Sequence, residues 1–281
     1  MGARIERITF PGSSGASLAA RLDLPAGPPR AFALFAHCFT CGMDIHAASR
    51  VANALTDVGF GVLRFDFTGL GMSEGEFANT NFTSNTEDLV AAADWLRSTH
   101  RAPQVLIGHS LGGAAVLAVA GSIPEVRAIA TIGAPASPEH VTGVFSSSLE
   151  EIESTGVAEV QLAGRPFTIR KQFVDDLRNH VATDRVATMK RALLVLHSPV
   201  DNTVGIENAA EIFLAARHPK NFVSLDGADH LLSEYSDAAF AASMIGAFAN
   251  RYIVDESGAR DAPRATAPVV VAETSQGVFL N

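Results

Sequence analysis

The residues best suited to chemistry in this sequence of 281 residues are a serine, an aspartate and a histidine that each follow a predicted strand. Ser110 lies in Gly-His-Ser-Leu-Gly, after the apolar run VLI and before a long run of Ala, Leu and Val. A strand, a sharp turn and a buried helix are the context of a nucleophile elbow, where the glycines Gly108 and Gly112 avoid clashes with nearby backbone. The pattern therefore predicts that Ser110 is a nucleophile and that the unpaired N–H groups of the new helix face the atom it attacks. The alternative is a glycine-rich turn with an idle serine.

Candidates for the acid and the base follow Ser110 in the chain. Asp201 lies in the loop after the buried run 193–197, where a carboxylate can accept the Nδ1–H of a histidine and stabilise the imidazolium. His230 lies in a loop of small residues before an apolar helix, and we predict that it is the general base. The order Ser, Asp, His is that of an α/β-hydrolase triad. The alternatives are an Asp201 that caps the following helix and a structural loop histidine.

The fold that must position these residues is an α/β fold. Two alternating segments, 4–10 and 17–24, predict an N-terminal antiparallel hairpin. Buried strands then alternate with helices, which predicts a doubly wound, mostly parallel sheet. The alternation of strands and helices is interrupted at about 137–190, which we interpret as a small lid insertion above the carboxyl edge of the sheet. We expect one domain over 1–252, with a linker or C-terminal extension at 253–281.

The lid carries phenylalanines that could meet a substrate. Phe145, Phe167 and Phe173 are predicted to face it, since ligand sites are lined mainly by apolar and aromatic side chains. The alternative for each is that it only holds the insertion together.

Composition excludes several classes of function. The net charge of −9 argues against a nucleic-acid partner, and 47% hydrophobic content allows a sizeable core. The sequence shows no signal-peptide pattern and no apolar run near the ~20 residues of a membrane span, so we expect a cytoplasmic protein with no membrane partner. Cys38 and Cys41 are too close together to staple a secreted fold. A homo-oligomer is compatible with these features.

The motifs together resemble the α/β-hydrolase superfamily, and more closely its esterase branch with an H-G-F-T-type loop and a small lid, as in cinnamoyl-ester hydrolases. The resemblance covers about 4–252 and rests on HCFT at 37–40, DFTGLGMS at 66–73, GHSLGG at 108–113, Asp201 and His230. It implies an oxyanion hole made by the backbone N–H groups of Phe39 and Leu111, and substrate contacts from Thr40 and His109. One departure is Cys38, where relatives usually have Gly and where a side chain narrows the approach.

The tail at 268–279 is similar to the linker and opening strand that join such hydrolases to an OsmC-like peroxide-reducing domain. This resemblance implies a fused OsmC-like domain in the full-length protein.

We therefore predict a serine carboxylesterase that hydrolyses small to medium acyl or aromatic esters through an acyl-enzyme on Ser110. Its partner is a small-molecule ester, and it needs no cofactor and no metal. Other reactions on the same triad are thioester hydrolysis and acyl transfer. Rival interpretations are a thiol redox protein that uses Cys38 and Cys41, and a non-catalytic ligand-binding module. A metal site with Cys38, Cys41 and His46 lacks an evident fourth ligand.

Overall fold

A computed structural model of the chain describes residues 3–162, 164–180 and 182–253. The predicted extension at 253–281 lies outside these residues except for Ile253. Within the described part of the chain, no helix combines the length and the apolar character needed to cross a membrane.

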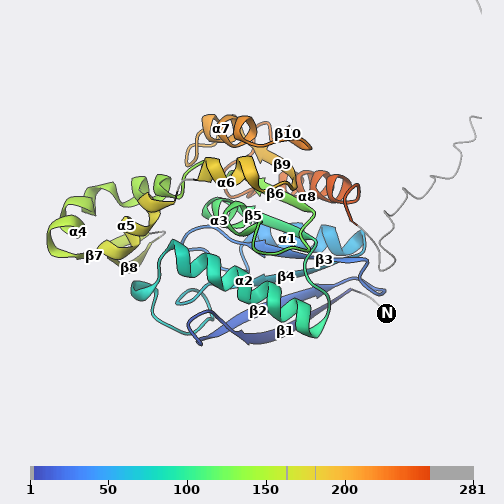
Figure 1. Cartoon of the computed structure of the whole chain (residues 1–281), viewed down its shortest axis with the longest axis horizontal. Coiled ribbons are helices and arrows are strands. Elements are labelled where there is room, and N and C mark those ends of the chain that lie inside the picture. Colours follow the sequence, from blue (N-terminus) through green and yellow to red (C-terminus); the bar gives the residue numbers. More distant parts are fainter. Residues whose placement is uncertain (1–2, 163, 181, 254–281) are drawn as a thin grey trace, which may run out of the picture.

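The centre of the molecule is an eight-stranded sheet with the order β1-β2-β4-β3-β5-β6-β9-β10 (Figure 1). β1 pairs antiparallel with β2 and β2 with β4, whereas all other neighbours are parallel. The predicted doubly wound, mostly parallel sheet with an N-terminal hairpin is therefore confirmed. The strands are β1 (Arg4–Pro11), β2 (Ser17–Leu24), β3 (Ala31–Ala36), β4 (Phe60–Phe65), β5 (Val105–His109), β6 (Ala128–Ile132), β9 (Ala192–His197) and β10 (Lys220–Ser224).

Helices cover both faces of the sheet, which explains why the central strands are apolar throughout. Residues of α1 and α8 share one buried cluster with one side of the strands, and residues of α2, α3, α6 and α7 share a second cluster with the other side. The helices are α1 (His46–Asp57), α2 (Phe82–Thr99), α3 (Leu111–Val119), α6 (Ala182–Thr188), α7 (Glu207–Ala215) and α8 (Tyr235–Ala249).

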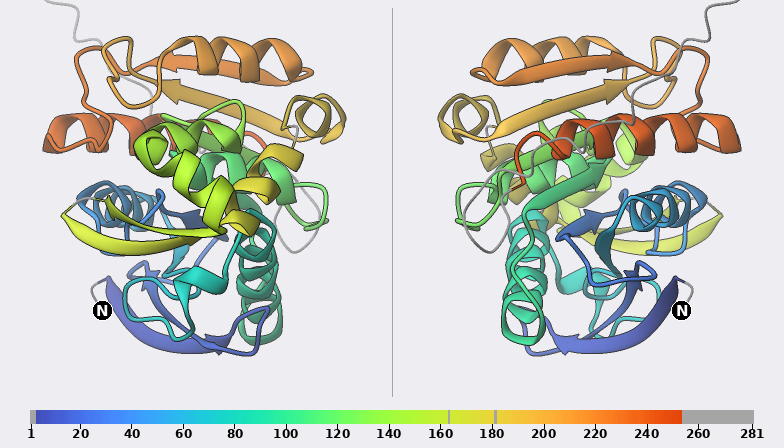
Figure 2. Two further views of the ribbon diagram at one scale, coloured as in Figure 1. Left: turned by 90° about the vertical axis from the view of Figure 1, so that its left-hand side faces the viewer. Right: turned by 90° about the vertical axis from the view of Figure 1, so that its right-hand side faces the viewer.

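The chain between β6 and β9 carries the predicted insertion. A separate hairpin and two helices project beyond one end of the large sheet, at the left of Figure 1 and toward the viewer in the left view of Figure 2. The short elements η2 and α6, which the sequence analysis did not predict, precede and follow this hairpin and its two helices. Both are short or irregular and gain their stability from packing rather than from a periodic pattern. The elements are η2 (Pro138–Ser148), α4 (Leu149–Thr155), β7 (Val157–Leu162), β8 (Arg165–Arg170) and α5 (Lys171–Asn179).

A buried ion pair braces the sheet beneath the loop that follows β3. The Arg64 guanidinium on β4 donates two hydrogen bonds to Asp23 on β2, at 2.7 and 3.2 Å, and both residues are almost fully buried. Its remaining nitrogen donates to the Met43 carbonyl at 2.6 Å and to Ser49 at 3.0 Å. One guanidinium therefore ties two strands to the segment that leads into α1.

Loss of one partner from this pair should be costly, because it leaves the other charge buried. We expect Asp23→Asn to lower the free energy of unfolding by about 3 kcal/mol or more. Glu125→Gln is the matched control, because its partner Arg97 forms an ion pair in which both side chains are more than a third exposed. That change should cost less than about 1 kcal/mol. Urea unfolding measures both, and equal effects would contradict a structural role of the buried pair.

Candidate active site

The nucleophile elbow depends on two close backbone approaches. A Cβ added at Gly108 would lie 2.3 Å from the carbonyl oxygen of Gly112, and one added at Gly112 would lie 2.3 Å from that of Ala36. No side chain fits at either position. Between them, Ser110 has φ 55° and ψ −127°, a conformation that a non-glycine residue adopts only under strain. The chain thus turns sharply from β5 into α3 at the serine, as the sequence predicts.

Two backbone amides border the same cleft as Ser110 and have no hydrogen-bond partner among the described residues. Leu111 is the first residue of α3, so its N–H cannot bond within the helix, and Phe39 lies in the loop after β3. Among the described residues, neither N–H donates to another protein group. Phe39, Leu111 and Ser110 border the same cleft. An anionic oxygen that develops in this cleft could therefore accept from both amides.

Asp201 and His230 form the second half of the site. His230 Nδ1 lies 2.7 Å from Asp201 Oδ2 and donates to it, since the carboxylate can only accept. The other oxygen, Asp201 Oδ1, accepts from the backbone amides of Thr203 at 2.8 Å and Val204 at 2.9 Å. The pair therefore fixes the tautomer of His230 and leaves Nε2 unprotonated. In the described residues, the Ser110 hydroxyl and His230 share the cleft but form no hydrogen bond.

The charge state of Asp201 follows from these contacts. Burial alone would raise the pKa of its carboxyl, but the hydrogen bonds from His230, Val204 and Thr203 outweigh burial and lower it below its usual range. Asp201 is therefore ionised at neutral pH and can stabilise a positive charge on His230.

Gly133, at the end of β6, is a site residue that sequence reasoning missed. It has φ +54°, and a Cβ there would lie 3.2 Å from Asp201 Oδ2 and 3.3 Å from His230 Nδ1. A side chain at this position would crowd the Asp–His pair. Its position in the sequence could have indicated this, because Gly133 directly follows β6, which lies between β5 and β9 in the sheet. Ser110 follows β5, and the loop with Asp201 follows β9.

His109 lies beneath the site and does not border the cleft. Its Nε2 donates to the backbone carbonyl of His230 at 2.7 Å, and the two rings lie 5.1 Å apart. Burial, together with repulsion from His230, lowers the pKa of His109 to about 4. His109 is thus a neutral donor that holds the His230 loop, rather than the substrate contact that the resemblance implies.

The loop that carries Phe39 is closed by a disulfide between Cys38 and Cys41. The two residues that it encloses are Phe39 and Thr40, and Thr40 has φ 59°, which is rare for a β-branched residue. Thr40 and both cysteines border the cleft, as predicted for Thr40. In this disulfide-bonded form neither sulfur is a free thiol. The redox interpretation requires a nucleophilic thiol, and only the reduced form would have one.

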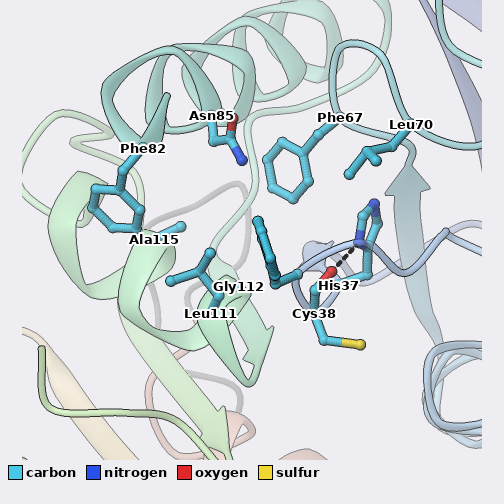
Figure 3. Close-up of a pocket in the computed structure, with 10 residues that line it drawn as sticks. His37, Cys38, Phe67, Leu70, Phe82, Asn85, Leu111, Gly112 and Ala115 are labelled. Carbon is cyan, nitrogen blue, oxygen red and sulfur yellow. Dashed lines mark hydrogen bonds between the residues drawn. The ribbon is translucent and has the colours of Figure 1, made fainter. Parts of the chain in front are cut away.

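A second, very small pocket of about 10 Å³ lies behind this loop (Figure 3). His37 and Cys38 come from the loop, Leu111 and Ala115 from α3, and Phe82 from α2. His37 Nδ1 donates to the Cys38 carbonyl at 2.8 Å, which adds a fixed point to the loop. The pocket is too small for a substrate, so the main cleft is the candidate binding site.

The lid phenylalanines pack against Phe39 and Phe77 and do not border the cleft. Phe173 stacks on Phe39 with ring centroids 5.5 Å apart, and Phe145 lies 6.3 Å from it. Phe167 contacts Phe77 at 5.1 Å. None of the three lid residues is among the described residues that border the cleft. Their placement matches the alternative stated above, because they fasten the lid to the oxyanion loop.

The cleft has a volume of about 1130 Å³ and opens between the lid and the carboxyl end of the sheet. Ser110 and His230 border it on the sheet side, the loops 202–204 and 231–233 contribute one rim, and η2 with the hairpin tip contributes the other. Among the described residues, no group of three or more His, Cys, Asp or Glu is arranged to hold a metal ion. The groups at the cleft are a serine, a histidine that bonds to an aspartate, and two backbone amides.

Comparisons with known proteins identify the family of the chain. A family model described as "Serine aminopeptidase, S33" matches residues 27–180. A curated relative is the mitochondrial palmitoyl-protein thioesterase ABHD10 of Mus musculus, which is 27% identical over 214 residues, covering 73% of this chain and 70% of the relative. The rat protein is 23% identical over 216 residues, with the same coverage.

Solved structures are similar over most of the chain. The esterase domain of a Rhodothermus marinus protein is 52% identical, with a TM-score of 0.72, over 89% of this chain and 99% of that one. Est1E of Butyrivibrio proteoclasticus with bound ferulic acid has a TM-score of 0.71 at 20% identity, over 86% and 97% of the two chains. The second likeness concerns the fold alone.

The lowered pKa of His109 predicts a pH-dependent stability. In the unfolded chain a histidine binds a proton as the pH falls below about 6.5, whereas His109 in the folded protein binds one only near 4. The unfolded state therefore holds more protons between these values, and the free energy of unfolding should fall by about 3 kcal/mol from this residue as the pH drops from 6.5 to 4.

The test compares urea unfolding of the parent chain and His109→Gln at several pH values. The glutamine amide can still donate to the His230 carbonyl but does not titrate. The difference in free energy of unfolding between the two proteins should shift by about that amount across pH 6.5 to 4. A difference that stays constant with pH would contradict the assignment.

Proposed function

The chain belongs to the α/β-hydrolase family described as "Serine aminopeptidase, S33", and we propose that it is a serine esterase that cleaves carboxylic esters through an acyl-enzyme on Ser110. One observation carries this proposal. A strained serine at a strand–helix turn borders the same cleft as two unpaired amides and a histidine that is hydrogen-bonded to a buried aspartate.

The first half of the reaction uses His230 as a base. Its unprotonated Nε2 takes the hydroxyl proton of Ser110 as the oxygen attacks the ester carbonyl. The positive charge that forms on the imidazole is stabilised by Asp201, which is ionised. The carbonyl oxygen becomes an oxyanion, and the N–H groups of Phe39 and Leu111 donate to it. His230 then returns the proton to the leaving alcohol.

The second half repeats these roles with water. His230 deprotonates a water that attacks the acyl-enzyme, the same two amides bind the new oxyanion, and Ser110 leaves with the proton from His230. The apolar character of much of the cleft, including Val141, Val144 and Leu162 of the lid, suits an acyl or aromatic group.

The relatives support hydrolysis of acyl compounds. The Rhodothermus marinus domain is described as an esterase, and ABHD10 as a thioesterase. Thioester hydrolysis is therefore a second candidate reaction, because it proceeds through the same acyl-enzyme.

The nucleophile is tested by Ser110→Ala. The variant should lose nearly all turnover of p-nitrophenyl butyrate, because no acyl-enzyme can form, and should no longer be labelled by a fluorophosphonate. Ser198→Ala is a matched control, since this buried serine follows β9 and does not border the cleft. Full turnover and labelling of the Ser110 variant would remove the proposal.

The role of Asp201 is tested by Asp201→Asn. The amide cannot hold the Nδ1–H tautomer as the carboxylate does, so kcat should fall by a factor of the order of 10⁴ with a small change in KM. Asp226→Asn, in the loop before His230, is the control and should retain activity, because Asp226 accepts a hydrogen bond from Ser224 and not from the imidazole. Equal rates for the two variants would rule out the triad.

A further inference from the structure

We propose that the cleft selects substrates that carry an anionic group, a carboxylate, on the part of the ester near Arg165, and that Arg165 binds this group. The inference rests on the proposed esterase function and adds the substrate class. It begins from a cation that borders the cleft and that, among the described residues, has no carboxylate partner.

Arg165 lies at the start of β8, at the tip of the lid hairpin, and borders the cleft. Its Nη2 donates to the backbone carbonyl of Thr40 at 2.6 Å, and its guanidinium carbon lies 5.4 Å from the ring centroid of Phe167. A guanidinium has five N–H donors. In the described part of the chain, Arg165 uses one of them and has no carboxylate within 4 Å. The side chain is thus held in place while most of its donors remain available.

This position is close to the reacting centre. Thr40 directly follows Phe39, whose N–H we assign to the oxyanion hole. With 3.8 Å between consecutive Cα atoms, the guanidinium lies within roughly 10 Å of that amide. A carboxylate separated from the ester carbonyl by a short spacer can therefore reach Arg165 while the carbonyl oxygen occupies the oxyanion hole.

The acidic groups around the cleft are satisfied elsewhere. Asp44 is paired with Arg21 and Arg64, and Asp66 accepts the backbone amides of Met43 at 2.6 Å and Met72 at 2.9 Å.

Asp201 is bonded to His230 as described above. Of the described residues that border the cleft, none is Asp or Glu. The chain has a net charge of −9, so an anionic substrate is repelled by the protein as a whole. A cation at a cleft without bordering acidic side chains can offset that repulsion locally.

The N-terminus of α1 adds to the same field. Ile45 precedes the helix and provides no side-chain cap, the first turn holds no acidic residue, and Ile45 and His46 border the cleft. The partial positive charge of a helix N-terminus favours a nearby anion. The N-terminus of α1 and Arg165 both border this cleft, and each favours an anion there.

The test uses two pairs of matched esters. In the first pair the acyl group is varied, with p-nitrophenyl hemiglutarate against p-nitrophenyl valerate, which have the same chain length. In the second pair the alcohol is varied, with 4-carboxyphenyl butyrate against phenyl butyrate. The parent chain should prefer the anionic member of at least one pair by about tenfold in kcat/KM, mainly through KM, as expected for a charge-assisted hydrogen bond. The pair that shows the preference identifies the side of the ester that carries the anion.

The variant that decides the proposal is Arg165→Gln. It should reduce kcat/KM for the anionic esters about tenfold more than for the neutral esters, and any loss that both kinds share reports the lost hydrogen bond to Thr40. Arg165→Lys keeps the positive charge and should retain much of the preference, which separates charge from support of the Thr40 loop. Arg170→Gln is the matched control, because this arginine of the same strand bonds to Asn79 outside the cleft.

The outcomes separate the two proposals. No anionic preference in the parent chain, or equal effects of Arg165→Gln on charged and neutral esters, would overturn the role of Arg165 and leave the esterase function standing. Full turnover of all four esters by Ser110→Ala would instead overturn the proposed function itself.

Discussion

The site depends on one steric constraint, the close passage of backbone against backbone at the nucleophile elbow. A Cβ at Gly108 would collide with the carbonyl of Gly112, and a Cβ at Gly112 would collide with the carbonyl of Ala36 at the end of β3. This contact joins the turn that holds the serine to the strand from which the oxyanion loop departs. The distance between Ser110 and Phe39 is therefore set by packed backbone, which cannot relax as a long side chain does. Any residue with a Cβ would separate the two parts of the site.

The histidine is positioned differently, by hydrogen bonds to its loop. Asp201 fixes the ring of His230, and buried His109 holds its carbonyl, so both the side chain and the backbone have a fixed partner. Gly133 leaves the space in which the pair meets. These contacts come from the ends of β5, β6 and β9, which are neighbours in the sheet. A parallel sheet thus brings together residues that are more than a hundred positions apart in the sequence.

The sequence was most informative where local chemistry and topology agree. The elbow glycines and the buried strands predicted the fold. The order Ser, Asp, His pointed to Ser110 and His230, which border one cleft, and to Asp201, which bonds to His230. The sequence was less informative where packing decides. Nothing in the residue types of Phe145 and Phe173 reveals that they contact Phe39 and not a ligand, because an aromatic side chain suits both settings. Arg165 was missed for a related reason, since an exposed arginine in a hairpin turn is ordinary until its neighbours are known.

In the loop that carries Phe39, both the local residue types and the packing of the insertion determine the conformation. The resemblance stated in the sequence analysis implies glycine at position 38, and the side chain of Cys38 would be expected to alter the loop. The disulfide to Cys41 counters this, because it closes the chain around Phe39 and Thr40 and limits the conformations of Thr40, whose φ is positive. The aromatic contacts of Phe39 and the hydrogen bond from Arg165 to Thr40 then bind the lid to the same two residues. Aromatic contacts and one hydrogen bond therefore join the insertion to the loop that carries Phe39. Under the two proposals above, the group that binds the substrate anion is attached to the loop that supplies an oxyanion donor.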